Sequence, residues 1–136
     1  MKATILIIDD SLTVRQQVAA VLKADDYEVI EAGDGLAGLE AVRAHPEIAL
    51  ILCDVNMPRM DGLEFLEHFK DERSLPSLPV VMLTTNGTPD LIARAKRAGA
   101  RGWIVKPFQA DLLLGAVRRI AGDATRTSAS PGDVQG

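Results

Sequence analysis

The sequence predicts an α/β protein built as a three-layer sandwich, with a parallel five-stranded sheet between two layers of helices. Short apolar runs rich in Val and Ile alternate along the chain with amphipathic helical patterns. Apolar runs of this kind are typical of parallel strands that are buried on both faces. Five strands alternating with five helices therefore indicate helices packed on both sides of one sheet.

The first half of the chain holds three predicted strands and the helices that follow them. Ser11 can cap the first helix, and Gly33 and Gly35 flank the turn into the second. The apolar face of the first helix consists of Val14, Val18, Val21 and Leu22. The strands are expected at residues 5–8, 27–30 and 49–53.

The second half continues the same alternation. Thr88 and Pro89 are a helix cap and a first-turn proline, and Gly99 follows the helical pattern of residues 91–98 as a C-terminal glycine does. The apolar face of the last helix consists of Leu112, Ala116, Val117 and Ile120. The two remaining strands are expected at residues 80–83 and 103–105.

Length and composition indicate one globular domain, residues 1–121, followed by a flexible polar tail, residues 122–136. A chain of 136 residues, 47% of them hydrophobic and 25% charged, can bury a core of its own. The first apolar run is too short for a signal peptide or a membrane span. The single cysteine, Cys53, forms no internal disulfide, so we expect a cytoplasmic protein.

The net charge of −4 is unevenly distributed. Residues 1–89 hold 15 acidic and 7 basic side chains, whereas residues 90–121 hold 2 acidic and 7 basic ones. Solvated helix faces explain such a pattern, and so does a basic surface that binds a partner. The chain lacks the uniformly basic stripe of a nucleic-acid-binding protein.

Polar side chains gather at the predicted sheet edge that is formed by the carboxyl ends of the strands. Asp9 and Asp10 follow the first strand, Asp54 the third, Thr84 the fourth and Lys106 the fifth. Ligands of open α/β sheets bind at this edge. Each residue alone has an ordinary structural explanation, such as a helix-entry acid for Asp10, but five at one edge favour a functional site.

The residue types at this edge suit phosphoryl transfer. Three neighbouring acids disfavour one another's ionisation, and a divalent cation removes that conflict. Oxygen ligands suit Mg²⁺, which takes one or two carboxylates and keeps several waters. Asp54, alone at the end of the central strand, is best placed to be the nucleophile, since aspartate forms acyl phosphates in enzymes. Lys106 and Thr84 would then pair with phosphoryl oxygens.

Four segments of the chain match a known family, namely I-D-D-S-x-T-x-R, D-V-N-M-P-x-M-D-G, M-L-T-T and W-I-V-K-P-F. Together they resemble the receiver domain of two-component response regulators. The opening segment is most similar to the chemotaxis-type, single-domain members. The resemblance covers residues 1–121 and implies a flavodoxin-like sheet with the strand order 2-1-3-4-5.

The resemblance implies a role for each residue at the sheet edge. Asp54 is the phosphoacceptor, and Thr84 and Lys106 complete the catalytic set. The cofactor is Mg²⁺, which Asp10 binds directly and Asp9 binds largely through water. Asp54 and the backbone carbonyl of Asn56, which stands two residues after the acceptor, complete the metal site.

The resemblance also implies a switch and an output face. Thr84 and Trp103 form the switch, and a cis peptide bond joins Lys106 to Pro107. The predicted output face comprises Arg94, Lys96, Arg97, Arg101 and Trp103. Two positions depart from the family pattern: position 85, usually small, is Thr, and position 103, usually Tyr or Phe, is Trp.

The implied function is signalling through a phosphorelay. A sensor histidine kinase or a histidine-phosphotransfer domain donates the phosphoryl group, and the chain catalyses only its own phosphorylation and dephosphorylation. A downstream protein with an acidic surface binds the output face, in chemotaxis or motility control. No direct contact with nucleic acid or membrane is expected, and the protein is a monomer, or a dimer when phosphorylated.

Four alternatives are compatible with parts of the pattern. A flavodoxin-like cofactor-binding protein would need phosphate-binding glycines after the first strand, where Asp9 and Asp10 stand. A metal-dependent phosphatase would need substrate loops or a cap, and the predicted connections are short. A histidine-phosphotransfer protein would be an all-helical bundle with an exposed His, which the strand pattern excludes. A degenerate receiver, which folds but is not phosphorylated, would lack a site residue, and none is missing.

Overall fold

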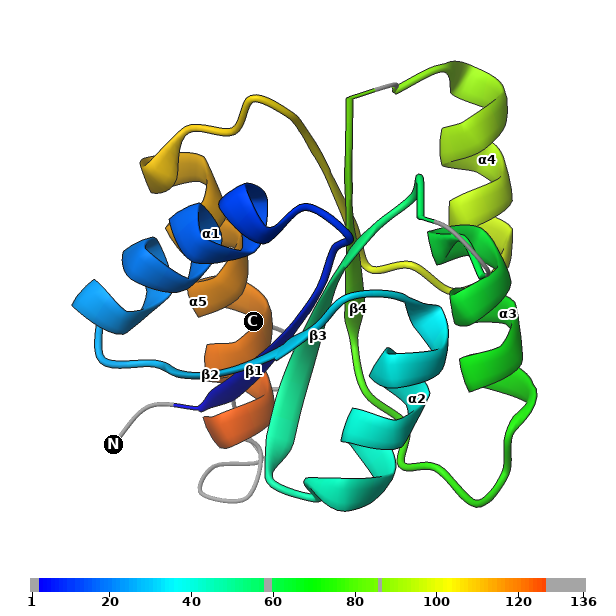
Figure 1. Ribbon diagram of the computed structural model, residues 1–136, viewed down its shortest axis with the longest axis horizontal. Coiled ribbons are helices and arrows are strands. Elements are labelled where there is room, and N and C mark those ends of the chain that lie inside the picture. The colour runs from blue at the N-terminus through cyan, green and yellow to red at the C-terminus, as the bar shows by residue number, and fades with distance from the viewer. Residues whose placement is uncertain (1–2, 58–59, 86, 127–136) are drawn as a thin grey trace.

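Five helices and five strands alternate along the chain in the computed structural model, which describes residues 3–57, 60–85 and 87–126, with side chains as far as 121 (Figure 1). The strands are β1 (Thr4–Ile8), β2 (Glu28–Ala32), β3 (Ile48–Asp54), β4 (Val80–Thr84) and β5 (Gly102–Val105). The helices are α1 (Leu12–Ala24), α2 (Gly35–Ala44), α3 (Gly62–Asp71), α4 (Pro89–Arg97) and α5 (Ala110–Arg126).

The strands form one sheet in the order β2-β1-β3-β4-β5, and every neighbouring pair is parallel. This confirms the predicted fold class and strand order. Because the strands are parallel, all their carboxyl ends lie at one edge of the sheet. The strand β4 is buried at every position, and β1 and β3 are buried at all positions but one each.

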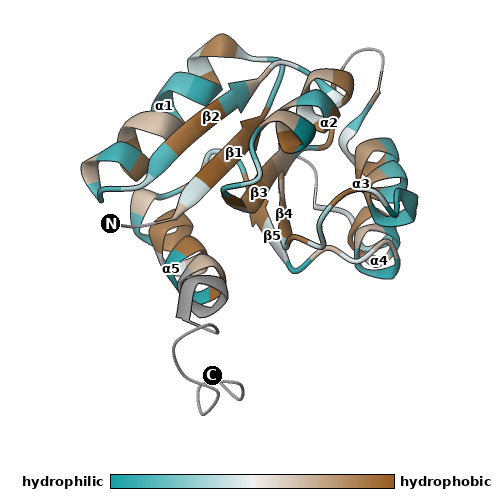
Figure 2. Ribbon diagram, turned by 90° about the horizontal axis from the view of Figure 1, so that it is seen from below, coloured by the Kyte–Doolittle hydropathy of each residue, from teal (hydrophilic) through white to brown (hydrophobic). Residues whose placement is uncertain are grey.

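Two apolar layers fill the space between the sheet and the helices. Leu6 and Ile8 face the layer under α2, α3 and α4, whereas Ile5 and Ile7 face the layer under α1 and α5. This alternation follows from the two-residue period of a strand. Figure 2 shows the two groups of helices on opposite sides of the sheet.

Local signals place the helix ends. The Ser11 side chain accepts a hydrogen bond from the Val14 amide, and Thr88 caps α4 with Pro89 at the first helical position. Gly99 follows α4 with a φ of +101°, a conformation that suits glycine. These predicted ends are confirmed.

Two predicted boundaries differ from the structure by two residues or more, whereas the other strands differ by at most one residue at each end. β2 spans Glu28–Ala32, later than the predicted 27–30, because it pairs in register with β1 from Thr4 to Ile8. Tyr27 instead packs into the core beside α1 and α5. α5 continues to Arg126, past the predicted domain end at 121, because an established helix lengthens at little cost. Residues 127–136, the rest of the predicted tail, lie outside the described ranges.

None of the helices in the described ranges combines the length and the apolar character that crossing a bilayer requires.

Candidate functional site

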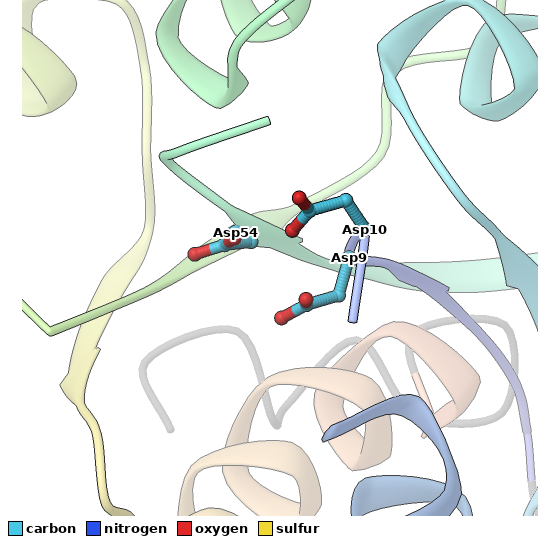
Figure 3. Close-up of side chains that lie close together, drawn as sticks. All are labelled: Asp9, Asp10 and Asp54. Atoms are coloured by element: carbon cyan, nitrogen blue, oxygen red, sulfur yellow. The ribbon is translucent and has the colours of Figure 1, made fainter. Parts of the chain in front are cut away.

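Two adjacent central strands bring three acids together. β1 pairs with β3 so that Ile8 stands opposite Cys53. Asp9, directly after β1, therefore lies beside Asp54, the last residue of β3. One carboxylate oxygen from each of Asp9, Asp10 and Asp54 lies within 4.8 Å of the others. Figure 3 shows these three side chains close together at the ends of the two strands.

The three acids differ in their exposure to solvent. Asp9 is fully buried and Asp54 is 4% exposed, whereas Asp10 is an exposed residue. Two carboxylates are thus held largely out of water, which is costly for ionised groups unless they are paired. The third opens the cluster to solvent and to any ligand that arrives from it.

Lys106 supplies a positive charge to this cluster. It follows β5, and its Nζ donates to Asp9 Oδ2 at 2.9 Å and lies 3.2 Å from Asp54 Oδ1. The Lys106 side chain is itself only 13% exposed. The peptide bond from Lys106 to Pro107 is cis. Three carboxylates facing one ammonium leave the cluster with a surplus of negative charge.

The electrostatics of the cluster follow from this surplus. Burial, followed by the negative charge of Asp9, raises the pKa of the Asp54 carboxyl, although Lys106 partly opposes the rise. Burial would lower the pKa of Lys106, but its hydrogen bond to Asp9 and the charges of Asp54 and Asp9 outweigh that and raise it. Asp54 is therefore a carboxylate whose ionisation the fold opposes, and Lys106 is a firmly charged partner.

Asp9 is held from several sides. Its carboxylate accepts the Ser11 amide at 2.9 Å, and its own amide donates to the Ala32 carbonyl at the end of β2. Arg15 Nη1 donates to the Asp9 carbonyl oxygen at 2.6 Å, and Arg15 Nε donates to Glu31. Neither Arg15 nor Glu31 was predicted to have a role. The position of Arg15 within the opening motif is the one signal in the sequence that points to such a role.

Thr84 closes the site on the β4 side. It ends β4, its side chain is buried, and its carbonyl accepts the Lys106 amide at 2.7 Å. Thr85, where the family has a small residue, is exposed. Thr84 and Lys106 are thus joined through the backbone at the edge where the acids lie.

The chain lies against the end of β3 again at Gly62, where α3 begins. Asn56 is exposed on the loop after β3, and the metal-binding role of its carbonyl stays a prediction. The Gly62 amide donates to the Val55 carbonyl at 2.8 Å, and a side chain at position 62 would overlap the Asp54 carbonyl oxygen. Glycine at 62 therefore lets α3 begin directly against the end of β3.

The residues of the predicted output face lie on α4, on β5 and in the turn between them. Trp103 is partly buried and packs against the core under α4. Its indole nitrogen is buried, and among the described residues it has no hydrogen-bond partner. Four basic side chains are exposed nearby in the chain: Arg94, Lys96, Arg97 and Arg101. Arg94 forms an ion pair with Glu67 of α3 at 3.3 Å.

The sequence matches the family described as response regulator receiver domain over residues 5–118. The chain belongs to this family. Receiver domains are the regulated modules of two-component systems, which have a phosphodonor kinase and a downstream target. Receiver domains generally bind Mg²⁺ at an acidic pocket, and this chain has a cluster of three aspartates.

Individual relatives support the assignment. The "Chemotaxis protein CheY" of Listeria monocytogenes is 36% identical over 119 residues, which cover 86% of this chain and 97% of that protein. The "Transcriptional regulatory protein PdtaR" of Mycobacterium tuberculosis is 34% identical over 132 residues, 96% of this chain but 62% of that protein. The receiver domain thus resembles proteins with different outputs.

Solved structures agree with the fold. A structure of the Vibrio cholerae chemotaxis protein CheY4 superposes with a TM-score of 0.79 at 38% identity, covering 88% of this chain and 99% of that one. A response regulator from Chloroflexus aurantiacus gives a TM-score of 0.82 at 30% identity, covering 90% and 99%. The flavodoxin-like architecture is therefore shared with CheY-like receiver domains.

Proposed function

We propose that this receiver domain is a phosphoacceptor whose Asp54 takes a phosphoryl group in a Mg²⁺-dependent reaction. The observation that carries the proposal is the cluster itself. A nearly buried carboxylate stands at the end of a central strand, two further carboxylates lie beside it, and the ammonium of Lys106 contacts it at 3.2 Å. Catalysis of phosphoryl transfer is mainly positioning and charge neutralisation, and this arrangement offers both.

The donor set fits Mg²⁺. All three acids offer oxygen ligands, which this hard cation prefers. Their charge exceeds that of Lys106, so a divalent cation would relieve the repulsion. Asp10 and Asp54 would bind it directly, Asp9 largely through water, and the Asn56 carbonyl would complete the set. When bound, the cation would neutralise charge on the phosphoryl oxygens.

The chemical step uses Asp54 as the nucleophile. Its carboxylate oxygen attacks the phosphorus of a phosphohistidine on the donor, the new O–P bond forms, and the P–N bond breaks. The imidazole nitrogen leaves with the electron pair and takes a proton from water. Lys106 and the Thr84 hydroxyl each pair with a phosphoryl oxygen. Hydrolysis later returns Asp54 to a carboxylate and releases inorganic phosphate.

The output of the phosphorylated domain is protein binding. The phosphoryl group draws the Thr84 side chain toward Asp54, Trp103 fills the space that is vacated, and a partner binds by preferring that arrangement. The basic side chains of α4 and its following turn suit an acidic partner. Single-domain relatives named for chemotaxis favour a role in chemotaxis or motility control.

The proposal includes no activity on other substrates. A sensor histidine kinase or a histidine-phosphotransfer domain supplies the phosphoryl group, and the chain catalyses only its own phosphorylation and dephosphorylation. A reducing, cytoplasmic compartment is part of the proposal because the single cysteine is a buried free thiol.

The test is phosphorylation by a small donor. The protein is incubated with acetyl phosphate, with and without Mg²⁺, and phosphate incorporation is followed by intact mass. We expect one phosphate per chain that requires Mg²⁺ and is lost in Asp54→Asn. Asp71→Asn, an exposed acid at the end of α3, is the matched control and should incorporate phosphate as the wild type does.

Two results would overturn the proposal. A wild-type protein that takes up no phosphate at saturating Mg²⁺ would be a degenerate receiver. Steady release of phosphate from a range of small phosphoesters, at a rate far above that of acetyl phosphate turnover, would indicate a phosphatase.

A further inference from the structure

Arg15 makes contacts that the phosphoacceptor role does not use. It stands in the first turn of α1, and its side chain is only 17% exposed. The guanidinium reaches two strand ends at once. Nη1 donates to the Asp9 carbonyl oxygen at 2.6 Å, and Nε donates to Glu31 Oε1 on β2 at 3.1 Å. An arginine whose Nε and Nη1 are both held by hydrogen bonds has little freedom to move.

The carbonyl that Arg15 holds belongs to the peptide bond between Asp9 and Asp10. A peptide unit is planar, so fixing its oxygen fixes the position of the next Cα and the direction in which that side chain leaves. Asp9 is already held through the Ser11 amide, the Ala32 carbonyl and Lys106. Asp10 is exposed, and its direction depends on the backbone that carries it.

We propose that Arg15 is a positioning residue that aims Asp10 at the cation, and that Glu31 anchors Arg15 for this task. The inference rests on the proposed function, because the cation in question is the Mg²⁺ of the phosphoacceptor site. Arg15 itself contacts neither the cation nor the phosphoryl group; it acts through the Asp9–Asp10 peptide.

If Arg15 acted through its charge alone, its removal would change the Mg²⁺ affinity in the opposite direction. The positive charge of Arg15 repels a cation, so its removal would tighten Mg²⁺ binding if charge alone mattered. Loss of positioning weakens binding instead. A purely structural role would lower the free energy of unfolding and leave the Mg²⁺ affinity unchanged. The direction of the affinity change therefore separates the three explanations.

The experiment measures Mg²⁺ affinity by titration calorimetry on the wild type, Arg15→Gln, Arg15→Lys and Arg118→Gln. We expect Arg15→Gln to weaken binding about tenfold, as is common for residues that orient ligands. Arg15→Lys keeps the charge but not the two-point contact, so it should weaken binding by a smaller factor. Arg118 is paired with Asp25 beyond the other end of α1. The control Arg118→Gln removes the same charge and should leave the Mg²⁺ affinity unchanged.

A second readout separates cation binding from chemistry. In Arg15→Gln, the Mg²⁺ concentration for half-maximal phosphorylation by acetyl phosphate should rise about tenfold, whereas the maximal rate should change less than about threefold. Unchanged or tighter Mg²⁺ binding in a folded Arg15→Gln would overturn the inference. If that variant does not fold, an Arg15→Lys with wild-type affinity would overturn it. A wild type that binds no Mg²⁺ would instead refute the proposed function.

Discussion

Ionising Asp54 in the folded protein costs free energy. Its side chain is nearly buried, it lies within the acidic cluster, and its pKa is raised by burial and by Asp9. A carboxyl with a raised pKa in the folded state favours folding while it is protonated. That contribution is complete below the ordinary pKa of about 4 and is lost as the pH rises through the raised pKa.

Asp54→Asn removes the charge but keeps the shape, so it should raise the free energy of unfolding at pH 7 by on the order of 1 kcal/mol. The gain should shrink toward zero as the pH falls below about 4, where the wild-type carboxyl is protonated. Urea unfolding across this pH range measures it. A variant less stable than the wild type at pH 7 would contradict the electrostatic account.

The ammonium of Lys106 is a compact charge that contacts two acids, since its Nζ lies close to both Asp9 and Asp54. In Lys106→Arg the planar guanidinium keeps the charge but cannot reproduce that contact. We predict that phosphate incorporation falls but persists, while the fluorescence response of Trp103 is lost. Both are measured on the same sample. Equal loss of incorporation and response would refute a separate role of Lys106 in switching.

At the scale of elements, the site depends on how closely α3 approaches β3. The Gly62 amide bonds to the Val55 carbonyl, and a Cβ at 62 would overlap the Asp54 carbonyl oxygen. The next turn is held by a capping box between Asp61 and Glu64. The start of α3 therefore sets where the acceptor strand ends.

Gly62→Ala should consequently destabilise the protein by about 1–3 kcal/mol, the usual range for overpacking. Thermal or urea unfolding measures this loss. Gly115→Ala in α5 is the matched control, because a Cβ there meets nothing within 4 Å. It should raise stability by about 0.8–1 kcal/mol through helix propensity. If both variants gain stability, the close approach of α3 to β3 does not constrain position 62.

At the scale of the whole molecule, the site and the predicted output face are linked through β4 and β5. Thr84 is the last residue of β4, at the edge where the acids lie. Trp103 of β5 stands opposite Met82 of β4. Trp103 is the chain's single tryptophan, so its fluorescence reports this face alone. Loading with beryllofluoride and Mg²⁺ should change its emission and reduce its quenching by iodide. Bound beryllofluoride with unchanged emission and quenching would mean that the switch does not pass through Trp103.

Much of this arrangement could be predicted from the sequence, for reasons that are physical. A buried parallel strand is visible in the sequence as an apolar run. Because the residues that follow such runs meet at one edge of the sheet, the sequence predicts that Asp9, Asp54 and Lys106 lie together. Contacts that depend on side-chain reach could not be predicted in this way. The pairing of Arg15 with Glu31 joins a helix to an edge strand, and neither residue interrupts a periodic pattern.

The most direct test of the central claim is to locate the phosphoryl group. Phosphorylated protein is treated with borohydride, which reduces an aspartyl phosphate to homoserine, and the changed residue is identified by peptide mass spectrometry. We predict homoserine at position 54 and at neither 9 nor 10, and only when Mg²⁺ was present. Modification at Asp9 or Asp10 with Asp54 intact would contradict it.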